Sequence, residues 1–413
     1  MKKHITIITS NFYPEDTAIG LYTTQLAEFL LDNNFNVSVL TGFPYYPRWE
    51  IFDEYKNKPI FFHEEYKGIK IYRYKQYVPE KPTFSGRIKQ ILSFTKGTLK
   101  NLQNIKNTDL VFVVVPYVTN IILGSILKKR LETKLWVHIQ DFEIDVAFQA
   151  NVIGSMSILK KFLYKFFSWF ENKLFNMADI ASTISYSMLK KFKEKTGKSA
   201  FYFPNWIDEN FINPKKFKYH RYFKDYRNKI KILYSGNIGN KQDWNLFLNL
   251  VDFLKDNKKI HFFVVGDGAR KKDLEDFINR KQLKNITLFS PVPYEELPDL
   301  LCSADIHILL QKVSVVDSVM PSKLLGMMAS EKPSFVVGNK NSEVKLILEK
   351  SQGGIYLSTN DVKLINRKLL ELANNKEKQK ILGANARRYV IENFSKNKVL
   401  NRFLGKLNEV LKG

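Results

Sequence analysis

The stretch KIKILYSGNIGNKQ, residues 229–242, decides the fold class, because an apolar β-rich run passes directly into glycines and a lysine. A glycine between a strand and a helix lets backbone N–H groups approach a phosphate, and the helix dipole favours the anion. HFFVVGDGARKK, residues 261–272, repeats the pattern, and Gly20 follows an apolar run at residues 4–10. Any one of these glycines alone is typical of a simple turn. Three such junctions together predict phosphate-binding turns, although none is GxGxxG or a P-loop.

The same alternation of apolar runs and longer amphipathic stretches continues along the whole chain, which is typical of parallel α/β architecture. Ligands of such folds bind at the carboxyl ends of the strands. The expected strands are residues 4–10, 37–41, 110–116, 134–139, 179–185, 200–204, 232–235, 260–265, 286–289, 306–309 and 334–337.

Residues 204–227 interrupt this alternation with two prolines, clustered charges and no clean period, which indicates a linker between two α/β halves. The strand ends of the two halves would then face a central cleft. The predicted parts are an N-terminal Rossmann-like domain at 1–204, a linker at 205–229, a C-terminal Rossmann-like domain at 230–384, and a helical segment at 385–413 that packs back toward the N-terminal domain.

The composition predicts a folded protein that works in a reducing compartment. Hydrophobic residues make up 44% of the 413 residues and charged residues 26%, as in globular proteins. The lone Cys302 excludes a disulfide framework. No apolar run approaches the roughly 20 residues that span a bilayer, and the N-terminus lacks a signal-peptide pattern. We therefore expect a cytoplasmic protein.

The net charge of +24 favours an anionic partner, which could be a nucleic acid, an anionic lipid or a phosphorylated substrate. Residues 81–106 contain six lysines and arginines and no acid, and residues 157–175 interleave lysines with Phe and Trp. Such helices lie at membrane interfaces, although a half-buried helix with solvated lysines gives the same pattern. The membrane candidates are Lys160, Lys161, Lys165 and Trp169.

A helix that begins at MPSKLLGMMAS, residues 320–330, has a lysine in its first turn. Pro321 suits the first helical position, and Ser322 and Lys323 then lie at the positive end of the helix dipole. A cation there breaks a local rule, which indicates an anionic ligand. The alternative is an exposed lysine that points into solvent.

KLWVHIQDFEID, residues 134–145, ends a strand with several polar side chains where a doubly wound sheet has its active site. Asp141 could accept a proton from a substrate hydroxyl or hold substrate hydroxyls, and a helix N-cap is the alternative role. His138 alternates with apolar neighbours and could be a core histidine. The cluster is His138, Asp141, Glu143 and Asp145, and too few His and Cys residues exist for a zinc site.

These motifs together resemble glycosyltransferase family 4, most of all its branch that builds O-antigen, capsule and colanic-acid repeat units. The resemblance covers nearly the whole chain. The motifs are TGFPYYPRW (41–49), HIQDFEIDVAFQ (138–149), PNWID (204–208), YSGNIGNKQ (234–242), VVGDG (264–268), SPVPYEELPDLLCSADIHIL (290–309) and MPSKLL (320–325).

The resemblance implies a GT-B fold and a retaining transfer of sugar from a nucleoside diphosphate to a polyprenyl-diphosphate-linked saccharide at the inner face of the cell membrane. It implies no cofactor and no metal. It also implies a catalytic role for Asp141, Lys241 and Lys323. The position of His138, Glu143 and Asp145 beside the end of the same strand makes them candidates for acceptor or sugar contacts. The implied donor-binding residues are Gly20, Gly236, Asn237, Gly239, Gly266, Gly268, Gln311, Pro321 and Ser322.

The chain departs from the family pattern at the donor loop. Many members carry two glutamates seven residues apart, one of which binds ribose, and the matching positions here are Ser318 and Gly326. Family grounds favour a UDP donor and an N-acetylated 6-deoxyhexose or N-acetylhexosamine. The alternatives are a sugar-nucleotide epimerase on the same scaffold, or a nucleic-acid-binding protein, for which the sequence shows no recognised motif.

Overall fold

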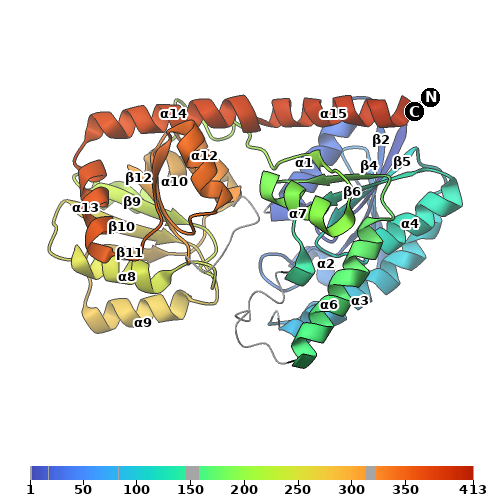
Figure 1. Ribbon diagram of the computed structural model, residues 1–413, viewed down its shortest axis with the longest axis horizontal. Helices are drawn as coiled ribbons and strands as arrows, with labels where there is room; N and C mark the ends of the chain where they lie inside the picture. Colours follow the sequence, from blue (N-terminus) through green and yellow to red (C-terminus); the bar gives the residue numbers. More distant parts are fainter. Residues whose placement is uncertain (1, 17, 82, 146–157, 313–321, 413) are drawn as a thin grey trace. The chain divides into compact units, whose positions relative to one another are not determined.

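The computed structural model describes residues 2–412 except 17, 82, 146–157 and 313–321. The chain divides into two compact units: unit 1 is Met1–Pro204 with Leu400–Gly413, and unit 2 is Asn205–Val399. Each unit is a largely parallel sheet with helices on both faces (Figure 1). Two α/β domains built on parallel sheets confirm the predicted fold class.

Unit 1 contains an eight-stranded sheet in the order β3-β4-β2-β1-β5-β6-β7-β8. All its pairs are parallel except the antiparallel β3–β4 hairpin at one edge. β5 is buried along its whole length, as expected for a strand covered on both faces. The strands are β1 (His4–Ile8), β2 (Asn36–Gly42), β3 (Phe61–Tyr66), β4 (Ile69–Tyr74), β5 (Leu110–Val115), β6 (Lys134–Ile139), β7 (Ile180–Thr183) and β8 (Phe201–Tyr202).

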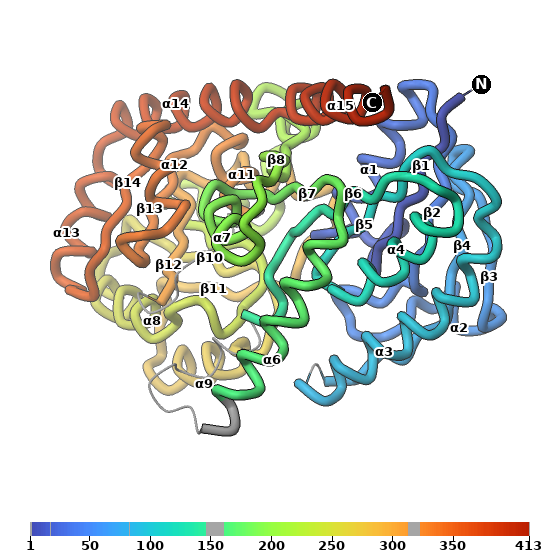
Figure 2. The backbone as a smooth tube through the Cα atoms, turned by 45° about the vertical axis from the view of Figure 1, so that its right-hand side comes forward, coloured from blue at the N-terminus to red at the C-terminus, as the bar shows by residue number. Residues whose placement is uncertain are grey.

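The two faces of this sheet are covered by different helices. A Cβ added at Gly124 of α4 would contact Val113 and Leu135 side chains, so α4 packs closely on one face of β5 and β6. On the other face, Phe403 of α15 packs against Phe112 and Trp136. Figure 2 shows α3, α4 and α6 together on one side. The helices are α1 (Ala18–Asp32), α2 (Asp53–Lys56), α3 (Phe84–Asn101), α4 (Asn120–Leu131), α6 (Ile158–Phe175), α7 (Tyr186–Thr196) and α15 (Lys396–Lys412).

Unit 2 contains a six-stranded sheet, all parallel, in the order β11-β10-β9-β12-β13-β14. The chain order reverses direction at β9 and β12, and such a switch point is where open α/β sheets bind ligands. The strands are β9 (Ile230–Ser235), β10 (Ile260–Val265), β11 (Ile286–Phe289), β12 (Ile306–Leu310), β13 (Ser334–Val337) and β14 (Gly354–Leu357). The helices are α8 (Trp244–Phe253), α9 (Lys271–Lys281), α10 (Leu297–Ser303), α11 (Ser322–Ala329), α12 (Glu343–Ser351), α13 (Val362–Ala373) and α14 (Lys376–Phe394).

The segment that the sequence assigns to a linker, residues 205–229, belongs to unit 2 instead. Ile212 and Phe223 are buried in the hydrophobic core of that unit. The Arg387 guanidinium of α14 also donates to the carbonyl oxygens of Ile212, at 2.9 Å, and Glu209, at 3.2 Å. Scattered apolar residues with no secondary-structure period therefore still form part of the core.

The C-terminal segment begins earlier than residue 385 and consists of two helices rather than one. Ser395 separates α14 from α15 and forms an isolated parallel bridge with Ile207. The Phe394 carbonyl accepts from the Ile207 N–H at 2.9 Å, and the Ile207 carbonyl accepts from the Lys396 N–H at 2.8 Å. These bonds replace helical ones and break the helix, and residues from Leu400 onward group with unit 1.

Candidate functional site

Two glycine turns meet at the carboxyl ends of β9 and β10 in unit 2. Gly236 has a φ of 129°, a conformation that side chains rarely permit. A Cβ added at Gly266 would lie 2.0 Å from the Gly236 carbonyl oxygen, and one at Gly268 would lie 2.4 Å from Asn237 Oδ1. The glycines therefore allow the two strand ends to approach each other without side chains between them.

The backbone N–H groups of these glycines are engaged within the turns. Gly236 N–H donates to the Val265 carbonyl at 2.9 Å, and Gly266 N–H donates to the Phe289 carbonyl at 3.0 Å. Gly268 N–H donates to the Asp267 carboxylate at 2.8 Å. The N–H groups of Gly236 and Gly266 therefore join neighbouring strand ends, and that of Gly268 binds the side chain of the preceding residue.

Lys323, in the first turn of α11, has its ammonium group beside the Gly236 turn. A Cβ on Gly236 would be 3.1 Å from the Lys323 ammonium nitrogen, so the ammonium lies directly over the glycine. Lys323 Nζ donates to the Tyr234 hydroxyl at 2.9 Å, and that hydroxyl donates to the Asn237 carbonyl at 2.6 Å. A buried tyrosine thus orients the lysine, and burial raises the pKa of Tyr234. Sequence reasoning gave Tyr234 no role.

The other residues of unit 2 that were predicted to bind the sugar donor differ in exposure and in their hydrogen bonds. Lys241 is exposed, and its carbonyl accepts from the Lys312 N–H at 3.2 Å. Gln311 is 5% exposed at the end of β12 and forms a bridge with Gln242. Gly239 accepts the Trp244 indole N–H at 2.9 Å through its carbonyl. Pro321 and Ser318 lie outside the described residues, and of Ser322 only its place at the start of α11 is described.

The Gly326 position explains why a family glutamate has no counterpart there. A Cβ added to Gly326 would lie 3.2 Å from Leu301 Cδ1 and 3.6 Å from Ile212 Cδ1. A glutamate at this position would place its stem against apolar core, where an unpaired carboxylate is costly.

In unit 1, His138 is a core histidine. It is 4% exposed and packs against Phe112 and Phe203 on the face covered by α15. Its Nδ1 is 2.9 Å from the Ser182 hydroxyl, and burial lowers its pKa to about 3. Its Nε2 is 2.9 Å from Gln140 Nε2, so both ring nitrogens have partners within unit 1, and the structure supports the core role of His138 over the acceptor contact.

Asp145 also has structural partners. Its carboxylate is 2.7 Å from Lys191 Nζ and 3.4 Å from Lys195 Nζ, and it accepts from the Tyr164 hydroxyl at 2.8 Å. Burial alone would raise its pKa, but these partners lower it. Asp145 is 3% exposed and ties α7 to α6, so the structure corrects its assignment from a sugar contact to a buried ion pair.

Asp141 and Glu143 remain near the carboxyl end of β6. Asp141 follows the strand by two residues and is part-buried. Glu143 is 3.4 Å from the Arg87 guanidinium. Burial raises the pKa of Glu143 to about 7, with the charge of Asp141 adding to the rise and Arg87 opposing it.

A second carboxyl group lies in the loop after β1. Glu15 Oε1 accepts the backbone N–H groups of Tyr45 and Tyr46, both at 2.8 Å, and burial raises the pKa of Glu15 to about 7. A Cβ added at Gly20 would lie 2.8 Å from the Glu15 carbonyl oxygen, so the start of α1 packs against this loop. Glu15 is 2% exposed, and the sequence gave no signal for it.

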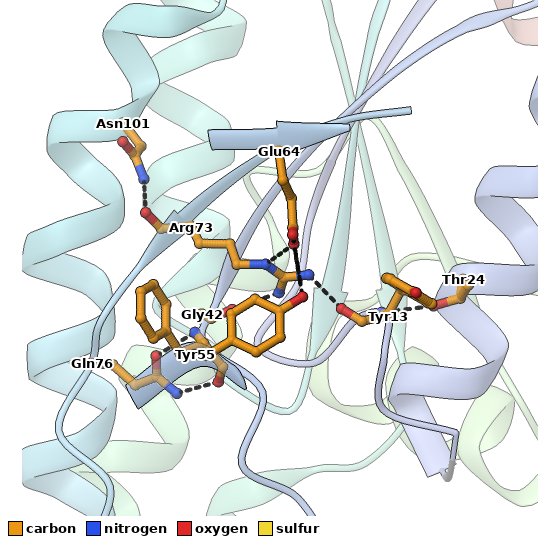
Figure 3. A network of polar contacts seen from close by, with 9 residues as sticks. Tyr13, Thr24, Gly42, Tyr55, Glu64, Arg73, Gln76 and Asn101 are labelled. Carbon is orange, nitrogen blue, oxygen red and sulfur yellow. Dashed lines mark hydrogen bonds and ion pairs between the residues drawn. The ribbon is translucent and has the colours of Figure 1, made fainter. Parts of the chain in front are cut away.

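Arg73 of β4 lies between the end of β2 and the loop after β1 and binds both (Figure 3). Its side chain is fully buried, pairs with Glu64 and donates to the Gly42 carbonyl at 3.0 Å and to the Tyr13 carbonyl. The Tyr55 ring lies 5.0 Å from the guanidinium carbon. One buried cation therefore joins the end of β2 to the loop that carries Glu15.

No three His, Cys, Asp or Glu side chains in the described part of the chain come together as metal ligands. Within the 138–145 cluster, Glu143 pairs with Arg87, and Asp145 pairs with Lys191 and Lys195.

Two α/β units with parallel sheets, glycine turns at the strand ends of unit 2 and a lysine above one of them define a GT-B glycosyltransferase fold. Solved structures of this class superimpose over nearly the whole chain. Sucrose-phosphate synthase from Thermosynechococcus elongatus has a TM-score of 0.73 at 13% identity, with 99% of each chain covered. Anabaena HepE in complex with UDP and glucose has a TM-score of 0.70 at 12% identity, with 98% of this chain and 100% of that chain covered.

The chain belongs to the group 1 glycosyltransferases. The profile described as "Glycosyl transferases group 1" matches residues 216–389. The putative colanic acid biosynthesis glycosyl transferase WcaI of Escherichia coli is 30% identical over 351 residues, which cover 83% of this chain and 85% of that protein. The predicted family and its branch are confirmed.

Two helices of unit 1 expose rows of large apolar side chains. On α6 the most exposed are Phe162 at 66%, Trp169 at 54% and Phe166 at 50%, and Lys161 and Lys165 are exposed beside them. On α3 the row is Phe84, Ile88, Leu92 and Leu99. No helix in the described part of the chain combines the length and hydropathy needed to span a membrane.

Proposed function

We propose that this glycosyltransferase transfers a sugar from a UDP-sugar, with retention, to a polyprenyl-diphosphate-linked saccharide during synthesis of a surface polysaccharide. The observation that carries the donor side is the Lys323 ammonium held over Gly236 by Tyr234. The likeness to a colanic acid enzyme supports the pathway class. HepE structures that contain UDP and UDP-glucose support UDP as the donor nucleotide. Family resemblance favours an N-acetylated 6-deoxyhexose or N-acetylhexosamine as the sugar.

In the proposed reaction, the bond between the anomeric carbon and the diphosphate oxygen breaks, and a bond to an acceptor hydroxyl oxygen forms. Fixed cations stabilise the charge that develops on the leaving diphosphate. Lys323 and the exposed Lys241 supply those cations, with Gln311 near the base. Asp141 faces the transferred sugar, where it takes the acceptor proton or holds sugar hydroxyls.

The test measures UDP release from a panel of UDP-sugars with and without acceptor. We expect release that requires an acceptor and a new glycosidic bond in the product. An epimerase would instead convert the free sugar nucleotide without acceptor. Thermal-shift measurements with UDP and GDP identify the nucleotide, since a ligand at one hundred times its Kd stabilises the fold by about 2.7 kcal/mol. Stronger stabilisation by GDP than by UDP would contradict the UDP assignment.

We expect the same reaction to proceed without divalent metal. Metal-assisted sites gather oxygen ligands, usually with carboxylates, around the phosphates, whereas none of the residues proposed for the donor diphosphate is a carboxylate. Dialysis against EDTA should therefore leave the rate within about twofold, as expected for charge stabilisation by fixed groups. Loss of activity that magnesium or manganese restores would contradict this expectation.

We also propose that unit 1 docks on the inner membrane face through the exposed rows of α3 and α6. Contiguous exposed apolar side chains flanked by lysines are what an interfacial helix requires. Polyprenyl-linked acceptors reside in the bilayer, so a membrane-docked unit 1 would meet its substrate there.

Co-sedimentation with anionic liposomes tests this docking. Lys161→Glu with Lys165→Glu should reduce binding at low salt at least tenfold, because each cation contributes about 1 kcal/mol near an anionic surface. Phe162→Ser with Trp169→Ser should reduce binding at high salt as well, because apolar insertion is not screened. Lys258→Glu with Lys363→Glu, both exposed in unit 2, is the matched charge control. Equal effects of the control pair would show that net charge alone drives binding.

A further inference from the structure

A cluster of aromatic and charged side chains gathers at the carboxyl ends of two strands of unit 1, β2 and β5, and at the start of α3. Tyr45 and Trp49 follow β2, and Tyr117 follows β5. Arg87 of α3 lies between them, with its guanidinium carbon 5.2 Å from the Trp49 ring centre and 5.5 Å from the Tyr117 ring centre. The Tyr45 and Tyr117 hydroxyls are 3.3 Å apart. The rings hold the guanidinium plane in place through cation–π contacts.

The polar contacts that Arg87 makes to Gln90 and Glu143 within this cluster are long. Its hydrogen bonds to Gln90 and Glu143 are 3.3 and 3.4 Å long, and a guanidinium carries five N–H donors. Burial raises the pKa of Glu143 to about 7, so this carboxyl group is about half protonated at neutral pH. Buried charges are normally paired, and an arginine in this state is suited to bidentate binding of a phosphate.

The backbone at Trp49 supports a functional role for the cluster. Trp49 has a φ of 59°, which is rare for a bulky residue and costs energy. Its ring packs at 5.7 Å from Tyr45 and 6.3 Å from Tyr46. These contacts maintain the strained residue with its ring against Arg87.

Arg87 is also adjacent to the exposed apolar row of α3. Phe84 and Ile88, on the same helix, are 59% and 39% exposed, and the Arg87 side chain is 28% exposed. The partly exposed guanidinium therefore shares a helix turn with two exposed apolar side chains.

We propose that Arg87 binds the diphosphate of the lipid-linked acceptor while the isoprenoid chain lies along Phe84 and Ile88. This inference rests on the proposed function, which supplies a lipid-linked acceptor. Trp49 and Tyr117 are positioning residues that orient the guanidinium. The site recognises an isoprenyl diphosphate ester, and it lies wholly within unit 1.

Titration of the full chain with farnesyl diphosphate, farnesol and inorganic pyrophosphate tests the proposal. Arg87→Gln should weaken farnesyl diphosphate binding at least tenfold and leave farnesol binding unchanged, which also shows that unit 1 is folded. Arg87→Lys should give an intermediate loss, because lysine keeps the charge without the fork geometry. Lys193→Gln, an exposed cation of α7, should behave as wild type. Equal loss for farnesol, or no loss for the diphosphate, would overturn the proposal.

Glu143→Gln provides a change of opposite sign. It removes the carboxylate that competes with the ligand, so farnesyl diphosphate should bind more tightly than to wild type. Because Glu143 is mostly ionised at pH 8 and mostly protonated at pH 6, the gain should be several-fold larger at pH 8. Asp141 and Glu171 also act on Glu143, and both are retained in this variant. An unchanged or weaker affinity would show that the pair is only structural.

The outcomes separate this inference from the proposed function. Transfer to a polyprenyl-linked saccharide with an unchanged acceptor KM in Arg87→Gln would overturn the Arg87 assignment and leave the function intact. Transfer only to a water-soluble saccharide would overturn the function, whereas the farnesyl diphosphate titration would still report on Arg87. Pyrophosphate that binds as tightly as farnesyl diphosphate would identify a free-anion site and overturn the lipid part.

Discussion

Replacement of Lys323 by methionine should lower turnover by about 10²–10³-fold, the typical cost of losing one preorganised group that stabilises developing charge. UDP affinity should fall as well, by roughly tenfold to a hundredfold, because charge-assisted contacts contribute about 1.5–3 kcal/mol. Methionine keeps the length of the side chain, so packing above Gly236 is largely retained. Calorimetric titration with UDP and steady-state kinetics measure the two effects.

Tyr234→Phe is the matched variant for this prediction. It removes the hydroxyl that accepts from Lys323 and donates to the Asn237 carbonyl, and it keeps the ring. We expect a loss of two- to tenfold in UDP affinity, the range of a single neutral hydrogen bond. If Tyr234→Phe equals Lys323→Met in both measurements, the lysine acts through the fold rather than on the diphosphate.

Two further variants test the roles proposed for Lys241 and Asp141. Lys241→Met should weaken UDP binding by about tenfold if its exposed ammonium turns to the diphosphate. Asp141→Ala should abolish turnover while UDP remains bound, because Asp141 is assigned to the sugar and not to the nucleotide. Loss of UDP affinity in Asp141→Ala would remove Asp141 from that role.

The central strands were predictable because a parallel sheet covered on both faces requires continuous apolar runs. LVFVVV and IHFFVV are such runs, and they became β5 and β10. The strands β3, β4 and β14 were missed, and β4 alternates buried residues with exposed or half-buried ones. β3 alternates exposed and half-buried residues, and β14 is half-buried throughout, so neither has a continuous apolar run. The β3–β4 turn did carry a signal, since Lys67 and Gly68 have the positive φ of a tight hairpin.

The candidate site was predictable only where a residue breaks a local rule. Lys323 stands at the wrong end of a helix dipole, and that conflict is visible in the sequence. Tyr234 and Arg87 break no such rule. Their partners are distant in the sequence, since the residue numbers differ by 89 for Tyr234 and Lys323 and by 56 for Arg87 and Glu143. His138 illustrates a different difficulty. The sequence alone does not distinguish a buried structural histidine from a catalytic one, and the packing of the His138 ring against Phe112 makes the distinction.

The buried Arg73 should be the most costly single side chain to remove from unit 1. Arg73→Met takes away the guanidinium that pairs with Glu64 and binds the Gly42 and Tyr13 carbonyls (Figure 3). Breaking a buried ion pair costs about 3–5 kcal/mol, because the remaining charge and the two carbonyls lose their partner. For a domain of this size we expect a fall of roughly 6–20 °C in the Tm of unit 1.

Arg48→Met is the control, because Arg48 is exposed and its recorded contact is to the Phe52 ring at 5.3 Å. Its Tm should change by less than about 2 °C, as for ordinary surface substitutions. Arg73→Lys should recover only part of the loss, since an ammonium cannot reproduce the planar fork. UDP binding by unit 2 should persist in all three variants, because Arg73 contacts only residues of unit 1 in the network described. A Tm for Arg73→Met equal to that of Arg48→Met would mean that Glu64 and the two carbonyls find other partners or water. The loops that carry Glu15 and Tyr45 would then still be joined by the hydrogen bonds of the Glu15 carboxylate to the Tyr45 and Tyr46 N–H groups.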